Sequence, residues 1–165
     1  MLKENDLEEV KKLLDLAENK IRQAKTKLFA NEMTKKAIML DDVEEGDVVQ
    51  GVFDGQQMIG NDKKTYQVPA NYASKSKLIP GDVLKLTILE DGKFVYKQIG
   101  PVPRKNVIGT IEELEDGEYQ VDVEGKKYRI LLASVTYFKA KQGDQLSVVI
   151  PVDGESAWAA VDNII

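Results

Sequence analysis

The stretch GDVLKLTI at residues 81–88 is followed by the turn DGK at residues 91–93, and both recur later as GDQLSVVI at 143–150 and DGE at 153–155. The offset is constant, because 143 − 81 and 153 − 91 both give 62, and it carries Tyr96 onto Trp158. A fixed period with matched turn residues and matched apolar positions indicates that one small β unit was duplicated. The repeat therefore predicts two related β units in tandem.

Each copy is predicted to hold five short strands, with a helical connection between the third and the fourth. The alternating pattern runs from Val48 to Ile99 in the first copy and from Val107 to Val161 in the second. This order is typical of an OB-type barrel, and an SH3-like barrel is the competing fold. The two prolines of GPVP at residues 100–103 predict a stiff linker between the copies.

Apolar residues also recur every seven positions near the N-terminus. The a positions of consecutive heptads are Leu7, Leu14, Ile21 and Leu28, and the d positions are Val10, Ala17 and Ala24. This spacing predicts a helix from about Asp6 to Ala30 with an apolar seam along one side. A second, shorter helical stretch is predicted over 31–40, and the acidic run at 41–47 is expected to end the helical part.

The seam has two interpretations. The small alanines at d positions would let a helix of another chain approach closely, which favours self-association through all seven seam residues. Leu13 and Leu16 widen the apolar stripe, however, and a wide stripe is typical of a helix that lies on its own domain.

The predicted fold class is mainly β with an N-terminal helix. We expect a helical segment at 1–40 and two small barrels, OB-like or SH3-like, at 41–103 and 104–165.

The composition excludes several function classes. The chain has 165 residues without cysteine or histidine, so disulfides, thiolate metal sites and the usual general base near neutral pH are excluded. No nucleophile and base fall in a recognisable pair, so we expect no enzyme activity, no cofactor and no metal. No apolar run has the length that a membrane helix needs, and we expect a cytoplasmic protein without membrane contact.

Aromatic and basic residues are interleaved in both copies, as in grooves that bind single-stranded nucleic acid. The candidate binding residues are Lys64, Tyr66, Asn71, Tyr72, Lys75, Lys77, Tyr96 and Lys97 in the first copy and Lys127, Arg129 and Trp158 in the second. In barrels of this size many aromatic residues belong to the core, and lysines are common on solvent faces. The net charges of −3 over residues 41–103 and −4 over 104–165 also oppose contact with phosphates.

Three stretches carry a family resemblance: GVFDGQQMIG at 51–60, YQVPANYASKSKL at 66–78 and YKQIGP at 96–101. They resemble an uncharacterised protein family of small-genome, candidate-phylum bacteria, whose members sometimes carry the automatic label of the ribosomal stalk protein. A stalk protein is expected to have a helical dimerisation segment, an Ala-rich hinge and an α/β end domain. Of its features, the acidic balance and the N-terminal helix fit this chain. The resemblance implies a bacterial source and no established activity.

These observations support two hypotheses of function. The first is a non-enzymatic macromolecule-binding protein with tandem OB-like barrels, with single-stranded RNA, the ribosome or the transcription machinery as its class of partner. The alternative is a protein–protein adaptor or oligomeric scaffold that uses the N-terminal helix to form a homo-oligomer.

Overall fold

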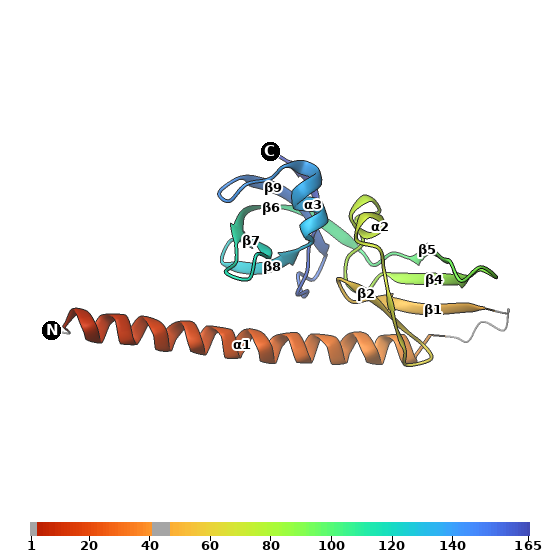
Figure 1. The fold of residues 1–165 in the computed structure, drawn as a ribbon, viewed down its shortest axis with the longest axis horizontal. Helices are drawn as coiled ribbons and strands as arrows, with labels where there is room; N and C mark the ends of the chain where they lie inside the picture. Colours follow the sequence, from red (N-terminus) through yellow and green to blue (C-terminus); the bar gives the residue numbers. More distant parts are fainter. Residues whose placement is uncertain (1–2, 41–46) are drawn as a thin grey trace.

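The computed structural model describes residues 3–40 and 47–165, which form one long helix and two five-stranded antiparallel sheets (Figure 1). The acidic run that was predicted to end the helical part lies, at residues 41–46, outside the described residues. The elements are α1 (Glu4–Ile38), β1 (Val48–Phe53), β2 (Gln57–Gly60), β3 (Thr65–Gln67), α2 (Ala70–Lys75), β4 (Val83–Ile88), β5 (Phe94–Gly100), β6 (Arg104–Glu113), β7 (Tyr119–Val123), β8 (Lys126–Ile130), α3 (Leu132–Phe138), β9 (Gln145–Pro151) and β10 (Ala160–Ile164).

The two sheets have the same topology. The strand order is β3-β2-β1-β4-β5 in the first sheet and β8-β7-β6-β9-β10 in the second, and all the neighbours within each sheet are antiparallel. In each case a short helix, α2 or α3, joins the third strand to the fourth. We call residues 47–100 the first β unit and residues 104–165 the second β unit. Their equal order agrees with the duplication that the repeat predicts.

The repeated Gly-Asp pair has the same structural role in both units. The N–H of Gly81 donates to the carbonyl of Phe53 and that of Phe53 to the carbonyl of Asp82, both at 2.9 Å. The equivalent bonds of Gly143, Ile111 and Asp144 are 3.0 Å long. Because both glycines have positive φ (99° and 91°), the sequence keeps glycine where the chain turns into the fourth strand.

The prediction of closed barrels was wrong, because neither sheet continues its ladder from the third strand to the fifth. In the first unit β3 has three residues and is followed by Pro69, which has no N–H to extend a ladder. In the second unit Arg129 of β8 exchanges backbone bonds with Ala157 (2.8 Å) and Ala159 (2.9 Å), which makes one isolated parallel bridge to Trp158. The strand β10 itself begins only at Ala160.

A buried carboxylate joins the two units. Asp82 is 0% exposed and accepts hydrogen bonds from the backbone N–H of Ile79 and of Val102, each at 3.0 Å. It also accepts from the Gln98 amide at 3.0 Å and pairs with the guanidinium of Arg104. Because Val102 and Arg104 lie in and just after the proline linker, one side chain of the first unit fixes the start of the second.

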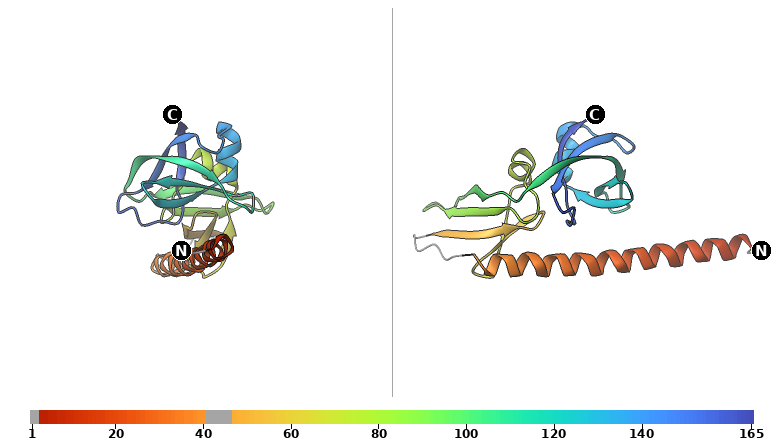
Figure 2. Two further views of the ribbon diagram at one scale, coloured as in Figure 1. Left: turned by 90° about the vertical axis from the view of Figure 1, so that its left-hand side faces the viewer. Right: turned by 180° about the vertical axis from the view of Figure 1, so that it is seen from behind.

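Apolar and polar contacts extend this junction. Ile79 of the first unit packs with Val149 and Ala160 of the second. The hydroxyl groups of Ser74 and Ser134, from α2 and α3, are 2.7 Å apart. Since the contacts lie on several elements of each unit, the two sheets form one body rather than two tethered domains (Figure 2).

The helix α1 is continuous from Glu4 to Ile38, so the predicted division near residue 30 is absent. No Gly or Pro interrupts it, and most of its residues favour helix. Its C-terminal end packs Met33, Ala37 and Leu40 on Val52 and Ile59 of the first sheet. Residues 3–28 are exposed on every face, and the N-terminal end projects past the β units (Figures 1 and 2).

We predict that Asp82→Ala lowers the free energy of unfolding by about 3 kcal/mol, because it removes four bonds and leaves the Arg104 charge without its partner. The matched control is Asp144→Ala in the second copy, which loses the bond from the Lys141 N–H (2.8 Å) and should cost about 1 kcal/mol. Urea unfolding followed by Trp158 fluorescence measures both. Equal losses would contradict the role given to Asp82.

Candidate functional site

An aromatic cluster lies where the first sheet stays open, between β3 and β5. The β4–β5 register places Phe94 opposite Ile88 and Tyr96 opposite Leu86, so both rings lie on the core face of the sheet. The ring of Tyr66 meets that of Phe94 edge to face at 6.1 Å, and the ring of Tyr72 stacks on that of Tyr96 at 6.1 Å. These side chains occupy the place of the missing β3–β5 ladder.

Hydrogen bonds hold two of the tyrosines in place. The Tyr96 hydroxyl donates to the carbonyl of Gln67 at 2.7 Å and so links β5 to the edge of β3, while the Tyr66 hydroxyl donates to the carboxylate of Asp62. Burial raises the pKa of Tyr96 to about 12, and burial together with the Asp62 bond raises the pKa of Tyr66 to about 12. Both hydroxyl groups are thus occupied within the unit, and Phe94, 45% exposed, is the more accessible ring.

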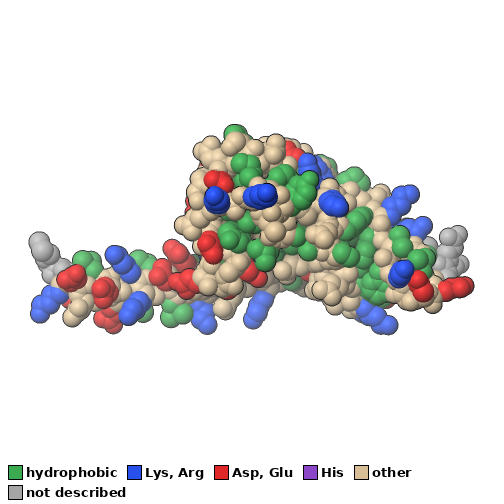
Figure 3. Space-filling model, turned by 45° about the horizontal axis from the view of Figure 1, so that its top comes forward, with side chains coloured by type: hydrophobic (Ala, Val, Ile, Leu, Met, Phe, Trp, Pro, Cys, Tyr) green, Lys and Arg blue, Asp and Glu red, His purple; other side chains and the backbone are tan. Residues whose placement is uncertain are grey.

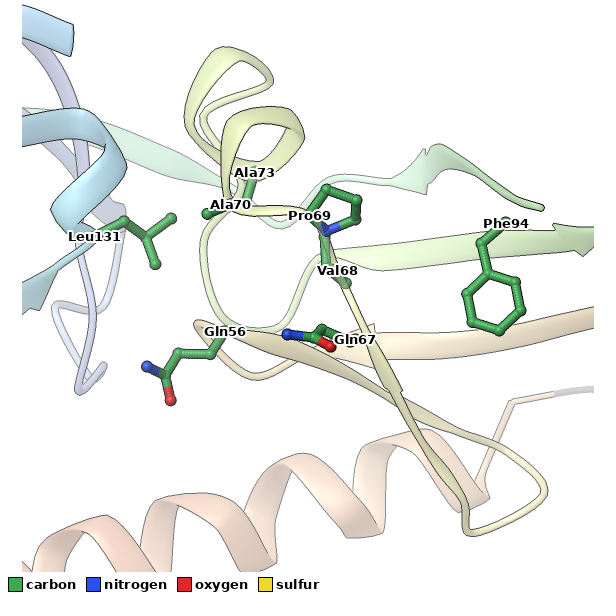
Figure 4. A pocket seen from close by; sticks show the side chains of 8 residues that line it. All are labelled: Gln56, Gln67, Val68, Pro69, Ala70, Ala73, Phe94 and Leu131. Atoms are coloured by element: carbon green, nitrogen blue, oxygen red, sulfur yellow. The ribbon is translucent and has the colours of Figure 1, made fainter. Parts of the chain in front are cut away.

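A groove runs beside this cluster along the end of β3 (Figure 4). Its volume is about 470 Å³, and Leu131 of the second unit lies at one end and Phe94 at the other. The lining residues are Gln56, Gln67, Val68, Pro69, Ala70, Ala73, Phe94 and Leu131. Apolar side chains with two amides suit an extended chain segment better than a small charged ligand.

The predicted binding residues do not form one surface, because the structure places them in three regions. Lys64, Tyr66, Tyr72, Tyr96 and Lys97 belong to the first sheet and its aromatic cluster. Asn71, Lys75 and Lys77 line a smaller cleft of about 260 Å³ between α2 and α3, where Lys77 pairs with Asp162 of the second unit. Lys127, Arg129 and Trp158 belong to the second unit.

Carboxylates neutralise the two predicted binding cations of the second unit, Lys127 and Arg129. The Lys127 ammonium lies 2.8 Å from Asp122 and 3.0 Å from Glu112, and Arg129 lies 2.6 Å from Glu118. The Asp122 bond raises the pKa of Lys127, and the Lys127 bond lowers the pKa of Asp122. Cations engaged in this way are poor ligands for a phosphate backbone.

Trp158 lies at the junction of the units. A Cβ atom on Gly55, in the β1–β2 turn, would come within 2.3 Å of the Trp158 ring, so the indole packs directly on that backbone. The guanidinium of Arg129 lies 6.0 Å from the ring centre. The Trp158 side chain thus packs in the contact between the first and the second unit.

The first unit keeps cations without an ion pair. Lys85 and Lys97 are directly opposite on β4 and β5, and neither has a carboxylate partner in the described part of the chain. Lys64 is also exposed, and its backbone N–H donates to Asp62 at 3.0 Å. Residues 47–103 hold seven lysines and six carboxylates, a net charge of +1, which becomes −3 when the acidic residues of 41–46 are counted, against −4 in the second unit.

Sequence reasoning missed the groove itself. Gln56, Val68, Pro69 and Leu131 are distant in sequence or belong to different copies, and their residue types signal no ligand. The signal that could have pointed there was Pro69, since a proline after a short third strand leaves an unpaired sheet edge.

The described residues form neither a metal site nor a membrane-spanning helix. Over 3–40 and 47–165, no three carboxylates are grouped closely enough to hold a metal ion. None of the described helices combines the length and apolarity needed to cross a bilayer. The chain matches no known protein-family model, no curated protein and no solved structure.

We predict that the free energy of unfolding falls between pH 10 and about 12. The pKa values of Tyr66 and Tyr96 are raised in the folded state, so their contribution is complete below pH 10 and is lost as the pH passes the folded value. The double variant Tyr66→Phe, Tyr96→Phe should show a smaller fall in urea unfolding over this range. A fall of the same size in the variant would mean that these phenols do not carry the effect.

Proposed function

We propose that this protein is a non-enzymatic oligomeric scaffold: α1 pairs with α1 of another copy, and the β units contact a partner protein. One observation carries the proposal. Residues 3–28 receive no cover from the described chain, yet Leu7, Leu14, Ile21 and Leu28 are between 47% and 66% exposed. In the space-filling view this rod shows hydrophobic, acidic and basic side chains together (Figure 3).

The seam is not turned toward the molecule's own sheet. Continuing the heptads along α1 puts Met33 and Leu40 at f positions and Ala37 at c, and these residues make the contact with β1 and β2. The a and d positions therefore lie on another face. Most helices gain their stability from packing of an apolar face, and here only a second molecule is available to supply it along residues 3–28.

The electrostatics of the β units favour a protein partner over nucleic acid. The two candidate binding cations of the second unit, Lys127 and Arg129, are paired with carboxylates, and the net charge of −4 of this unit repels phosphates. The groove along β3 is lined mainly by apolar side chains and two amides, which is the composition of a site for an extended peptide.

We also propose that both units are OB-like. The supporting observations are the strand order, which equals that of an OB barrel opened between its third and fifth strands, and the helix between the third and fourth strands. The parallel bridge of Arg129 to Trp158 lies where those two strands would meet. OB folds bind extended chains of several kinds, so the fold alone assigns no ligand.

Single-stranded RNA at the first unit is the second candidate, favoured by the exposed ring of Phe94 and the unpaired Lys64 and Lys97. If it is correct, binding of a fluorescent oligouridine should be measurable by anisotropy at low salt and steeply salt-dependent. Phe94→Ala should weaken it about tenfold through lost stacking, while Tyr137→Ala, an exposed ring outside the groove, should not. No binding at low salt would remove this candidate.

The scaffold proposal predicts a dimer or larger oligomer in light scattering. Leu14→Asp with Ile21→Asp should convert it to a monomer, because charges would enter the seam, and the β units should keep their stability since residues 3–28 do not touch them. The control is Asn19→Asp with Thr26→Asp, which adds the same charge at f positions. A wild-type monomer at high concentration would contradict the proposal.

A further inference from the structure

We propose that two copies pair through α1 in antiparallel orientation, with the two-fold axis passing between Asp15 and Leu16. In this register residue i of one helix faces residue 31 − i of the other. The inference rests on the proposed self-association and adds its geometry: the partner surface, the orientation and the positions of the two bodies.

The sizes of the seam residues complement one another in this register. Leu7 faces Ala24 of the second copy, Val10 faces Ile21, and Leu14 faces Ala17, and the two-fold axis repeats each layer. These three layers thus pair leucine with alanine, or two β-branched residues, and in the outermost layer at each end Leu28 faces Lys3. A parallel pair in register would instead place Ala17 on Ala17 and Ala24 on Ala24, leaving two underfilled layers on either side of the Ile21 layer.

The charges beside the seam favour the same arrangement. Antiparallel helices bring e positions beside e and g beside g, and flanking charges of this kind set the orientation of a pair. The pairs across the interface are Glu4 with Lys25, Lys11 with Glu18 and Asp6 with Lys27, each present twice and each attractive. The remaining g pair, Leu13 with Lys20, is neutral.

A parallel pair has poorer charge complementarity. Its g-to-e pairs are Asp6 with Lys11 and Lys27 with Glu32, which attract, and Lys20 with Lys25, which repel. The antiparallel helices can also be shifted by one heptad, so that residue i faces residue 38 − i. This register brings Lys11 beside Lys25 and Glu18 beside Glu18 of the second copy, and both pairs are repulsive. Among these arrangements, only the register that sums to 31 has no repulsive pair.

The exposed part of the helix supports this register independently. All residues from Lys3 to Leu28 are exposed, Phe29 is the first half-buried residue of α1, and Met33 is the first that packs on the first sheet. The midpoint of that stretch lies between residues 15 and 16, where the charge pattern places the axis. The overlap therefore covers the whole exposed segment and ends just before the contact of each helix with its own first sheet.

The arrangement fixes where the binding surfaces lie. The paired stretch of 26 residues is about 38 Å long, so the first β units lie at opposite ends of the rod. Two grooves of this kind, held apart by a stiff spacer, would engage two copies of a partner or two sites on one partner. The exposed Leu16 is at a c position and stays outside this contact.

Charge reversal at Lys25 discriminates between the orientations. Lys25→Glu places two glutamates together in the antiparallel dimer and should raise the dissociation constant about tenfold in sedimentation equilibrium. In the parallel dimer the same change would remove the repulsion from Lys20 and tighten the pair. Adding Glu4→Lys should restore the wild-type value, and Lys12→Glu, at an f position, is the control for the charge change.

A distance measurement gives a second test, because the chain has no native cysteine. Spin labels on Asn5→Cys, at an f position, should lie about 32 Å apart along the antiparallel rod, since position 5 faces position 26. A separation below about 20 Å, or tighter pairing of Lys25→Glu, would overturn the antiparallel inference while leaving self-association intact. A monomer in both experiments would overturn self-association as well.

Discussion

The buried carboxylate of Asp82 determines how the β part of the protein is assembled. An ionised group without solvent contact is stable only when its acceptor sites are filled, and here the donors come from the loop before β4, from β5, from the linker and from the first residue of β6. Because Asp82 needs Arg104 and Val102 as partners, the first unit can bury this carboxylate only when the linker follows its observed path. Trp158 on Gly55 and the Ile79 cluster complete the junction.

The junction also shapes the groove along β3. The groove along β3 takes most of its lining from the first unit and Leu131 from the second, so its shape exists only while the junction is formed. The first sheet lacks a β3–β5 ladder and the second has one bridge at that place. The two units thus share a topology but differ at this edge: the first is open and has lysines without an ion pair, and the second has a bridge beside the paired Arg129.

Unlike the two sheets, the helix α1 contacts the rest of the chain only near its C-terminal end. Its last turns are tied to the first sheet by Ala37, and by Lys36, whose ammonium donates to the Gly81 carbonyl at 2.6 Å. Burial lowers the pKa of that amine, and the Asp82 carboxylate partly offsets the effect. The base of the rod is anchored at the same junction that joins the sheets, while the remaining residues project freely.

Much of the fold could be predicted because the evidence is local and periodic. The Gly-Asp pairs, the Asp-Gly turns and the heptads identified the repeat, the strands and the helix. Barrel closure could not be predicted, since it depends on whether β3 can extend past Pro69 to meet a strand about 30 residues away. The candidate site could be predicted even less well. In the sequence Lys127 and Trp158 have the residue types of ligand-binding positions. Only the folded chain brings Asp122 and Glu112 to Lys127, and Gly55 to Trp158.

Amide hydrogen exchange at several protein concentrations tests most directly our proposal that a second copy covers residues 4–28 of α1. Protection of these amides should rise with protein concentration, whereas protection of the β sheets should not change. Protection of the helix that is low at every concentration, or independent of it, would mean that no second copy covers α1.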